Sequence, residues 1–309
     1  MSSTIPNISL LDLDLPSSID RLKEAFEQVG FVVITEHGIS KVLTDRFLNM
    51  FKEFFSWPDV RKMNYQLANA GGARGYTPFG VETAKDSEHV DLKEFWHIGR
   101  ELDAGHPMAS YMPQNLWIEA IEGFRSTSLE LYAAFDHVGR QLLRAIAKLL
   151  ELVDDFFEDK VDVGNSVLRV IHYPPLPASP TPSLRAGAHE DINVITLLLG
   201  AEEPGLQICT RSGAWLAVNP GPGSMVVNVG DMLQRLTNGV LRSTSHRVVN
   251  PTRDRASSSR YATPFFLHFN SNYLIQALPS CCGDGRAKPP PPILADDYLQ
   301  ERLREIRLK

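Results

Sequence analysis

The strongest constraint on the fold of this chain is a change of pattern near residue 160. Beyond it, short runs rich in β-branched and aromatic residues recur at positions 166–172, 194–199, 206–208, 224–229, 245–249 and 261–269. Turn residues separate these runs, for example at Asn238-Gly239 and Asn250-Pro251. Many short strands joined by turns are typical of a β-sandwich or barrel. We therefore expect residues 161–280 to form a β core.

The first half of the chain has helical spacing instead. Apolar residues recur every three or four positions across 17–29, 40–55 and 117–152, which predicts three amphipathic helices. Positions 5–10 and 31–35 read as strands, and 68–94 as a loop containing several glycines. No Gly/Ser-rich linker interrupts the chain. We expect residues 1–115 to pack on the core, 116–160 to form a long helix, and 281–309 to add a connector and a last helix.

Composition argues against several classes of function. The 309 residues carry a formal net charge of -6, whereas a nucleic-acid-binding protein needs a basic surface. The apolar stretch at 194–201 is too short to span a bilayer, and the first 14 residues show no secretory signal. Three cysteines without the spacing of a disulfide framework or zinc site favour a reducing cytoplasm. We expect a cytoplasmic protein with a small-molecule ligand and no obligatory protein partner.

A candidate metal site lies at the start of the run 194–199. His189 and Asp191 are two residues apart, so on a strand end their side chains point to the same side of the backbone. His246, at a neighbouring predicted strand, supplies a third ligand. Two imidazoles and one carboxylate on one face suit Fe(II) and leave the opposite face open for other ligands. The three residues therefore predict a non-haem iron centre.

The His-x-Asp pattern is weak evidence alone, because it occurs twice. The second instance is His89-Val90-Asp91, with His97 nearby. It lies in a charge-dense stretch without a long strand attached, and surface hydrogen bonding accounts for it. We favour the pair at 189 and 191, which precedes a run that must be buried.

Arg260 adds specificity to this assignment. It lies 14 residues after His246 and begins the apolar run Arg260-Tyr261-Ala262-Thr263-Pro264-Phe265. A guanidinium entering an apolar strand needs an anionic partner, and it matches a carboxylate with two parallel hydrogen bonds. That partner is either a carboxylate of the protein or a ligand. After a His-x-Asp and His set, we favour a ligand carboxylate.

Further motifs occur along the chain in a recognisable order. They are Gly30-Phe31-Val32-Val33-Ile34, Arg74-Gly75-Tyr76, Asp91-Leu92-Lys93-Glu94, Leu168-Arg169-Val170-Ile171-His172-Tyr173-Pro174, Pro204-Gly205-Leu206-Gln207, Gly230-Asp231 and Ser245-His246-Arg247-Val248. In these motifs and in their order, nearly the whole length of the chain resembles the 2-oxoglutarate/Fe(II)-dependent oxygenases of the isopenicillin N synthase-like family.

This resemblance implies a mainly β fold with flanking helices, whose core is a distorted double-stranded β-helix, or jelly-roll. It implies that His189, Asp191 and His246 bind Fe(II), and that Arg260, assisted by Tyr173, holds the distal carboxylate of the co-substrate 2-oxoglutarate. O2 then oxidises a small organic substrate by hydroxylation or desaturation, with release of succinate and CO2. Two positions depart from the family pattern: Ala262 stands in place of a serine, and Ile171 in place of a frequent asparagine.

Other functions remain open at this stage. Zinc also accepts two histidines and a carboxylate, so a metal-dependent hydrolase is one alternative, although hydrolysis gives no reason for Arg260. An oxidase of the same fold that needs no 2-oxoglutarate is another, and a non-catalytic binding barrel a third. Phe79, Trp96, His97 and Phe269 could line a substrate pocket, although large apolar residues usually belong to the core. Strand alternation does not decide whether His268 faces the interior of the barrel.

Overall fold

The computed structural model describes residues 5–67, 73–83, 89–176, 181–199, 204–283 and 285–305. The helices are α1 (Pro16–Gln28), α2 (Lys41–Phe55), α3 (Asp59–Lys62), α4 (Phe124–Leu149), α5 (Glu158–Val161), α6 (Asp231–Leu236) and α7 (Ala295–Glu305). The strands are β1 (Asn7–Ser9), β2 (Phe31–Thr35), β3 (Gly75–Thr77), β4 (Glu94–Gly99), β5 (Val167–Tyr173), β6 (Ala186–His189), β7 (Ile195–Leu199), β8 (Leu206–Cys209), β9 (Trp215–Ala217), β10 (Met225–Val229), β11 (His246–Val248), β12 (Arg260–Leu267), β13 (Leu274–Ile275) and β14 (Ile293–Leu294).

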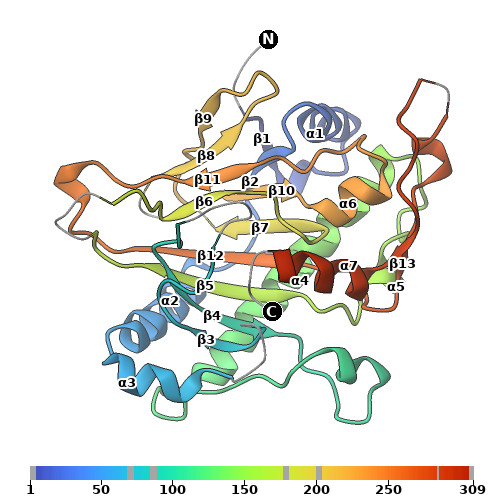
Figure 1. The fold of residues 1–309 in the computed structure, drawn as a ribbon. Helices are drawn as coiled ribbons and strands as arrows, with labels where there is room; N and C mark the ends of the chain where they lie inside the picture. Colours follow the sequence, from blue (N-terminus) through green and yellow to red (C-terminus); the bar gives the residue numbers. More distant parts are fainter. Residues whose placement is uncertain are drawn as a thin grey trace.

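The main sheet has eight strands in the order β1-β2-β10-β7-β12-β5-β4-β3 (Figure 1). Its four central strands come from the second half of the chain, and both flanks come from the first hundred residues. All neighbouring pairs are antiparallel except β1 and β2. The N-terminal region thus extends the sheet of the core instead of forming a separate unit.

A second sheet of four strands, β6-β11-β8-β9, faces the main sheet. Two apolar clusters fill the space between them. One joins Phe95, Ile171, Tyr173 and Ala262 of the main sheet to Ala186 and Val248 of the second. The other joins Phe31 and Val226 to Leu206 and Ile208. Two facing antiparallel sheets with apolar side chains between them form the expected jelly-roll.

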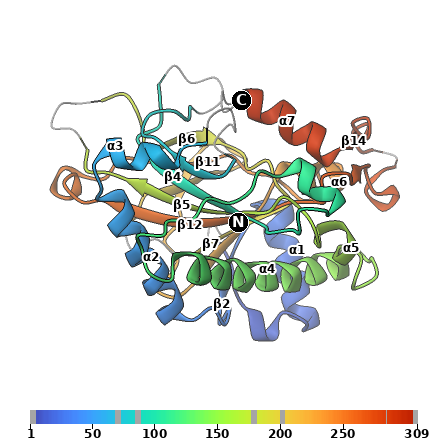
Figure 2. The ribbon, with the colours of Figure 1, turned by 90° about the horizontal axis from the view of Figure 1, so that it is seen from below.

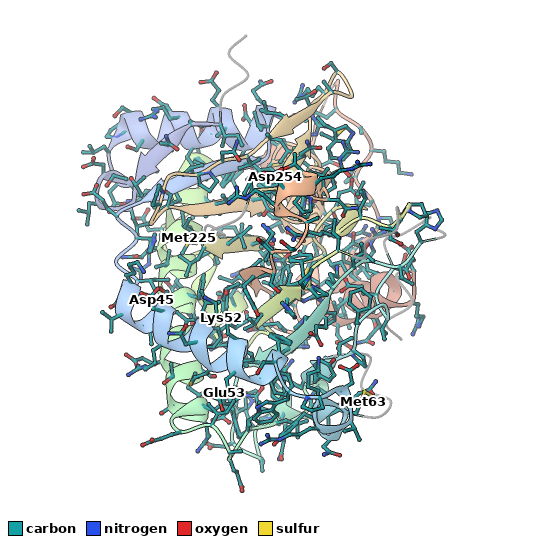
Figure 3. All side chains as sticks on the ribbon, turned by 90° about the vertical axis from the view of Figure 1, so that its left-hand side faces the viewer. Asp45, Lys52, Glu53, Met63, Met225 and Asp254 are labelled. Carbon is teal, nitrogen blue, oxygen red and sulfur yellow. The ribbon has the colours of Figure 1, made fainter. Side chains whose placement is uncertain are left out.

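Helices α1, α2 and α4 cover the opposite face of the main sheet (Figure 2). Helix α4 approaches the sheet closely at Gly139, where a Cβ atom would lie 2.5 Å from Cδ1 of Leu267 on β12. Helix α2 buries Leu43, Phe47, Met50, Phe51 and Phe54, which recur at helical spacing, while Asp45 and Glu53 lie on its exposed side (Figure 3). The helical layer therefore supports the sheet from behind.

Some boundaries differ from the sequence predictions. The helix expected across 117–152 is α4, which begins only at Phe124, because Gly123 adopts a left-handed conformation and Ile118 and Ile121 reach the core from turns. The stretch expected to be a loop contains β3, and part of it lies outside the described residues. Strands 31–35 and 261–269 were located correctly to within two residues. Among the described residues, no helix has the length and apolarity that crossing a bilayer requires.

Candidate metal centre

The three predicted metal ligands meet between the two sheets. His189 ends β6 and His246 begins β11, and the two residues are direct partners in the register of these strands. Asp191 lies in the turn that follows β6. Its Oδ1 is 3.9 Å from Nε2 of His189 and 3.8 Å from Nε2 of His246. Bonds of about 2.1 Å to one ion can join atoms up to about 4.2 Å apart, so a single metal ion fits between them.

The outer nitrogens of both rings are held by the backbone. Nδ1 of His189 lies 2.8 Å from the carbonyl oxygen of Gly187, and Nδ1 of His246 lies 3.1 Å from that of Thr244. A carbonyl oxygen accepts only, so each Nδ1 is the protonated nitrogen and each Nε2 carries a lone pair. Both lone pairs are therefore available to a metal, as in other metal sites where a backbone carbonyl orients a ligating histidine.

Asp191 is oriented by two polar side chains of the main sheet. Thr196 Oγ1 and Asn228 Nδ2 both donate to its Oδ2, at 2.6 and 2.8 Å, which leaves Oδ1 to face the histidines. Burial would raise the pKa of Asp191, but the two histidines and these hydrogen bonds outweigh it and hold the pKa below its usual range. The carboxylate is therefore ionised and ready to bind a cation.

The imidazole of His189 is kept neutral. Desolvation by burial is the main cause that lowers the pKa of His189, and the neighbouring His246 is the next; about 33% of the His189 side chain is still exposed. A neutral imidazole is the form that binds metals. The donor set, its protonation and its spacing all fit Fe(II), which favours two imidazoles with one carboxylate.

A narrow cavity of about 70 Å³ extends from the three ligands to Arg260. Arg260 is 3% exposed, begins β12 and is the register partner of Tyr173 on β5, whose ring centroid lies 5.0 Å from its guanidinium carbon. Ala262 and Ile171, the two departures from the family pattern, are also register partners and line the same cavity. The cavity is therefore cationic at one end and apolar along this wall.

A larger cavity of about 290 Å³ opens on the other side of His189 and Asp191. Its walls carry a network of charged side chains: Lys93 binds Asp91 at 2.8 Å and Glu82 at 3.3 Å, and Arg169 binds Glu82 at 3.2 Å. Burial would raise the pKa of Glu82, but Arg169 and Lys93 hold it at about 2. Helix α7 contributes Leu299, Arg302 and Leu303 to this cavity.

The structure separates the remaining candidates. His89 is exposed, and the one group of three possible metal ligands among the described residues is His189, Asp191 and His246. Asp91, however, is not a surface residue, because it is 4% exposed and binds Lys93. Of the four suggested pocket residues only His97 lines the larger cavity: Trp96 and Phe269 belong to the core, and Phe79 is 47% exposed. His268 is buried and faces the larger cavity.

Sequence reasoning missed the residues that orient Asp191 and, apart from His97, the charged residues that line the larger cavity. Thr196 and Asn228 are polar positions inside runs of β-branched residues, and such an exception is a sign of a buried polar role. Asp91 and Lys93 are two apart, so on extended chain they share a side, which could have suggested their ion pair. The sequence motif at 168–174 includes Arg169, but it did not suggest a position for this residue at the cavity.

Comparisons with known proteins agree with this geometry. Residues 5–120 match the family model described as the non-haem dioxygenase in morphine synthesis N-terminal region, and residues 164–269 match the 2OG-Fe(II) oxygenase superfamily. A 2-oxoglutarate-Fe(II) type oxidoreductase of Emericella nidulans is 33% identical, over 91% of this chain and 82% of the relative. Kihadalactone A synthase of Citrus sinensis is also 33% identical, over 98% of this chain and 94% of the relative.

Solved structures share the complete fold. A putative 2OG-Fe(II) oxygenase family protein from Caulobacter crescentus is 48% identical with a TM-score of 0.90, over 99% of this chain and 100% of that chain. A full-length Neurospora crassa protein in complex with alpha-KG is 28% identical with a TM-score of 0.84, over 97% of this chain and 95% of that chain. The predicted family and the predicted jelly-roll are thus confirmed. This chain belongs to the 2-oxoglutarate–Fe(II) oxygenase superfamily and is an oxidoreductase that uses Fe(II), 2-oxoglutarate and O2.

Proposed function

We propose that His189, Asp191 and His246 bind the Fe(II), that Arg260 and Tyr173 bind 2-oxoglutarate in the smaller cavity, and that the organic substrate occupies the larger one. The observation that carries this assignment is that both cavities share His189 and Asp191 as wall residues. A metal held there would face one cavity suited to a co-substrate and another suited to a substrate.

The smaller cavity suits a short dicarboxylate. Its inner end carries the guanidinium of Arg260, which can bind a carboxylate through two parallel hydrogen bonds. The ring of Tyr173 lies beside that guanidinium and limits where it can move. Ile171, Ala262 and Leu198 provide an apolar wall for a hydrocarbon chain. A dicarboxylate anchored by Arg260 would direct its other end toward the histidines.

When bound, Fe(II) supplies the redox chemistry that couples conversion of 2-oxoglutarate to succinate and CO2 with oxidation of the substrate. The residues of the chain supply orientation and fixed charge. Thr196 and Asn228 keep one oxygen of Asp191 toward the metal position. Lys93 and Arg169 line both cavities, and their charges are neutralised by ion pairs with Glu82 and Asp91. These fixed ion pairs therefore lie where the two cavities meet. Preorganised charges of this kind need no rearrangement during the reaction.

The chain has further expected properties. Relatives carry out different reactions by name, and the Neurospora crassa protein is also seen with thymine, so their names do not select one substrate. The net charge of -6 supports a small-molecule substrate over a nucleic acid, and no obligatory protein partner is proposed. The three cysteines are free thiols in the described structure, which supports a reducing compartment such as the cytoplasm.

Anaerobic reconstitution tests this proposal. Adding Fe(II) and then 2-oxoglutarate to the purified protein should produce the visible charge-transfer band expected when a keto acid chelates Fe(II). The His246→Ala variant should lack the band. On admission of O2, the wild-type protein should consume O2 and form succinate, faster with a true substrate. A wild-type protein that binds Fe(II) but gives no band would contradict the proposed role of Arg260 and favour an oxidase independent of 2-oxoglutarate.

A further inference from the structure

Arg74 is a buried arginine on the wall of the larger cavity. It directly precedes β3 and is 1% exposed. Its guanidinium lies across Gly99 of β4, where a Cβ atom would be 1.8 Å from Cζ of Arg74. Any other residue at position 99 would therefore displace the guanidinium, so the main sheet leaves room for it at this point.

The contacts of Arg74 within the described chain are all neutral. Nη1 donates to the carbonyl oxygen of Ala73 at 2.7 Å, and Nη2 donates to Oδ1 of Asn165 at 2.9 Å. Nε has no hydrogen-bond partner among the described residues. Burial lowers the pKa of Arg74 to about 10, which still leaves it charged at neutral pH. A buried charge without an opposite charge destabilises the folded state, because its desolvation is not compensated. Such a residue is therefore a candidate for a functional role.

The other cations of the cavity have carboxylate partners. Lys93 and Arg169 share Glu82 and Asp91, and Arg302 pairs with Asp231 at 3.6 Å and with Glu305 at 2.6 Å. Two further carboxylates line the cavity: Asp191 belongs to the proposed metal site, and Glu190 is exposed to solvent. Among the described residues no carboxylate lies within ion-pair distance of Arg74. Of the buried cations that line the cavity, Lys93 and Arg169 are thus matched by Glu82 and Asp91, whereas Arg74 has no carboxylate beside it among the described residues.

His268 lines the same cavity as Arg74 and Asp191 and lies within range of both charges. Burial, and next the charge of Arg74, lower its pKa to about 4, while Asp191 opposes the shift, so both charges act on this ring. The ring is therefore neutral at pH 7, and its Nδ1 has no hydrogen-bond partner among the described residues. Asn165 turns its amide oxygen to Arg74, which leaves its amide nitrogen for another acceptor. Arg74, Asn165 and His268 thus offer donors to one part of the cavity.

We propose that the larger cavity binds a compact substrate with a single carboxylate, and that Arg74 is its anchor, assisted by Asn165 and His268. A single negative charge matches the charge of Arg74, the buried cation without a carboxylate partner in the described structure, whereas a phosphate dianion would bring a second charge. The cavity of about 290 Å³ is at the lower limit of typical ligand pockets, about 300–1,000 Å³, which favours a small acid. With its carboxylate at Arg74, the acid extends past His268 toward the metal position, so oxidation occurs at a carbon remote from the carboxylate. This inference rests on the proposed function.

Paired probes test the charge requirement directly. The probes are aliphatic, alicyclic and aromatic monocarboxylic acids of six to twelve carbons, each compared with its own primary amide. Binding to protein loaded with Zn(II) and 2-oxoglutarate, which cannot turn over, is measured by ligand-observed NMR. At least one acid should bind about ten- to a hundredfold more tightly than its amide, the effect of a hydrogen bond to a charged group. Equal binding of every pair, or no binding of any acid, would overturn the proposal.

Variants then locate the anchor. Arg74→Met should weaken binding of the acid about ten- to a hundredfold and leave the affinity for the amide nearly unchanged. Asn165→Asp is the sharper test, because it places a carboxylate where Oδ1 now lies 2.9 Å from Nη2 of Arg74. This internal counter-ion should raise Tm and abolish the preference for acids. Asn165→Asp protein that still prefers acids would show that Arg74 is not the anchor, even where Arg74→Met does not fold.

Arg302→Met is the matched control, since it removes a cavity arginine that already has carboxylate partners. It should change the affinity for acids less than threefold, and an effect as large as that of Arg74→Met would overturn the assignment to Arg74. The band given by Fe(II) and 2-oxoglutarate in the wild-type protein separates the two proposals. Its absence contradicts the proposed function, whereas its presence with no preference for acids contradicts only the substrate class.

Discussion

Thr196 Oγ1 donates a 2.6 Å hydrogen bond to Oδ2 of Asp191, the oxygen turned away from the two histidines. Thr196 is on β7 and is 3% exposed, so no solvent molecule competes freely for this bond. Asn228 on β10 donates to the same oxygen. The orientation of the carboxylate is therefore set by two central strands of the main sheet, not by the turn that carries Asp191.

Replacing Thr196 by Val should weaken metal binding, because the shape remains while the donor is lost. Partners behind a ligand typically contribute about ten- to a hundredfold to metal affinity. Anaerobic competition against a chromophoric chelator measures the Fe(II) affinity. Thr196→Ser keeps a hydroxyl and should retain most of it. Equal affinity in Thr196→Val and the wild type would show that Asn228 alone is sufficient.

Removing a proposed ligand should have a larger effect. His189→Ala and His246→Ala should each lose most of the single Fe(II) per chain after anaerobic reconstitution, since two ligands do not replace three. His89→Ala is the control, because His89 is exposed and lies outside the ligand group. Metal content by elemental analysis, with O2 consumption, provides the comparison. Iron and activity retained in both His189→Ala and His246→Ala would refute the ligand assignment.

Arg260→Gln should weaken 2-oxoglutarate binding by about ten- to a hundredfold. The reason is the loss of a charge-assisted hydrogen bond, typically about 1.5–3 kcal/mol, where about 1.4 kcal/mol is tenfold. Anaerobic titration of the visible band with 2-oxoglutarate measures it. Succinate formation at saturating 2-oxoglutarate gives a second readout. An unchanged affinity would remove Arg260 from the co-substrate site.

Ala262→Ser tests the same cavity in the opposite direction. Position 262 lines the smaller cavity opposite Ile171, and a serine there adds the hydroxyl donor that the family usually has. The variant should bind 2-oxoglutarate more tightly, by about 1 kcal/mol at most for a neutral donor. Weaker binding would mean that the apolar pair at 171 and 262 excludes a hydroxyl. The same titration applies.

The stability of the cavity wall should depend on pH through Glu82. Its pKa is about 2 in the folded protein, below the ordinary value of 4.5, so the folded state favours the ionised form. This stabilisation is fully present above about pH 4.5 and is lost as the pH falls toward 2. Glu82→Gln should therefore be less stable at pH 7, by on the order of 3 kcal/mol. The difference should shrink during acid titration.

Urea unfolding at a series of pH values measures this difference. Glu130→Gln is the control, because Glu130 forms an exposed ion pair with Arg46 and such pairs contribute little. A stability difference between wild type and Glu82→Gln that persists unchanged at pH 2.5 would show that the charge of Glu82 is not its cause.

Local patterns were sufficient to predict much of the fold and the residues that meet in the candidate metal centre. The run 31–35 is apolar and β-branched throughout, and it forms β2 with the same limits. His189 and Asp191 are close in sequence, and the buried run after them located them at the end of a strand. Information of this kind is contained in neighbouring residues, so a single sequence is enough to provide it.

Apart from the pairing of His246 with His189, features that depend on distant partners were not predicted. Strand β6 has the sequence Ala-Gly-Ala-His, without strand propensity, and it is a strand because β11 pairs with it. The burial of Asp91 depends on Lys93 and on the amide of Gly187, which lies 96 positions later. The sequence does not show that Arg74 is buried or that its hydrogen-bond partners are neutral groups. Sequence spacing does not encode such pairings.

The position of β2 between β1 and β10 has a consequence for synthesis of the chain. Its apolar residues 31–35 leave the ribosome long before Met225–Val229, the strand that covers their open edge. At about 5–20 residues per second this interval lasts on the order of ten to forty seconds. An unpaired apolar strand is a template for association with other chains. We therefore expect chains that terminate before β10, for example anywhere in the middle third of the sequence, to aggregate. Such chains would burden the cell's protein quality control and would not yield a partial enzyme.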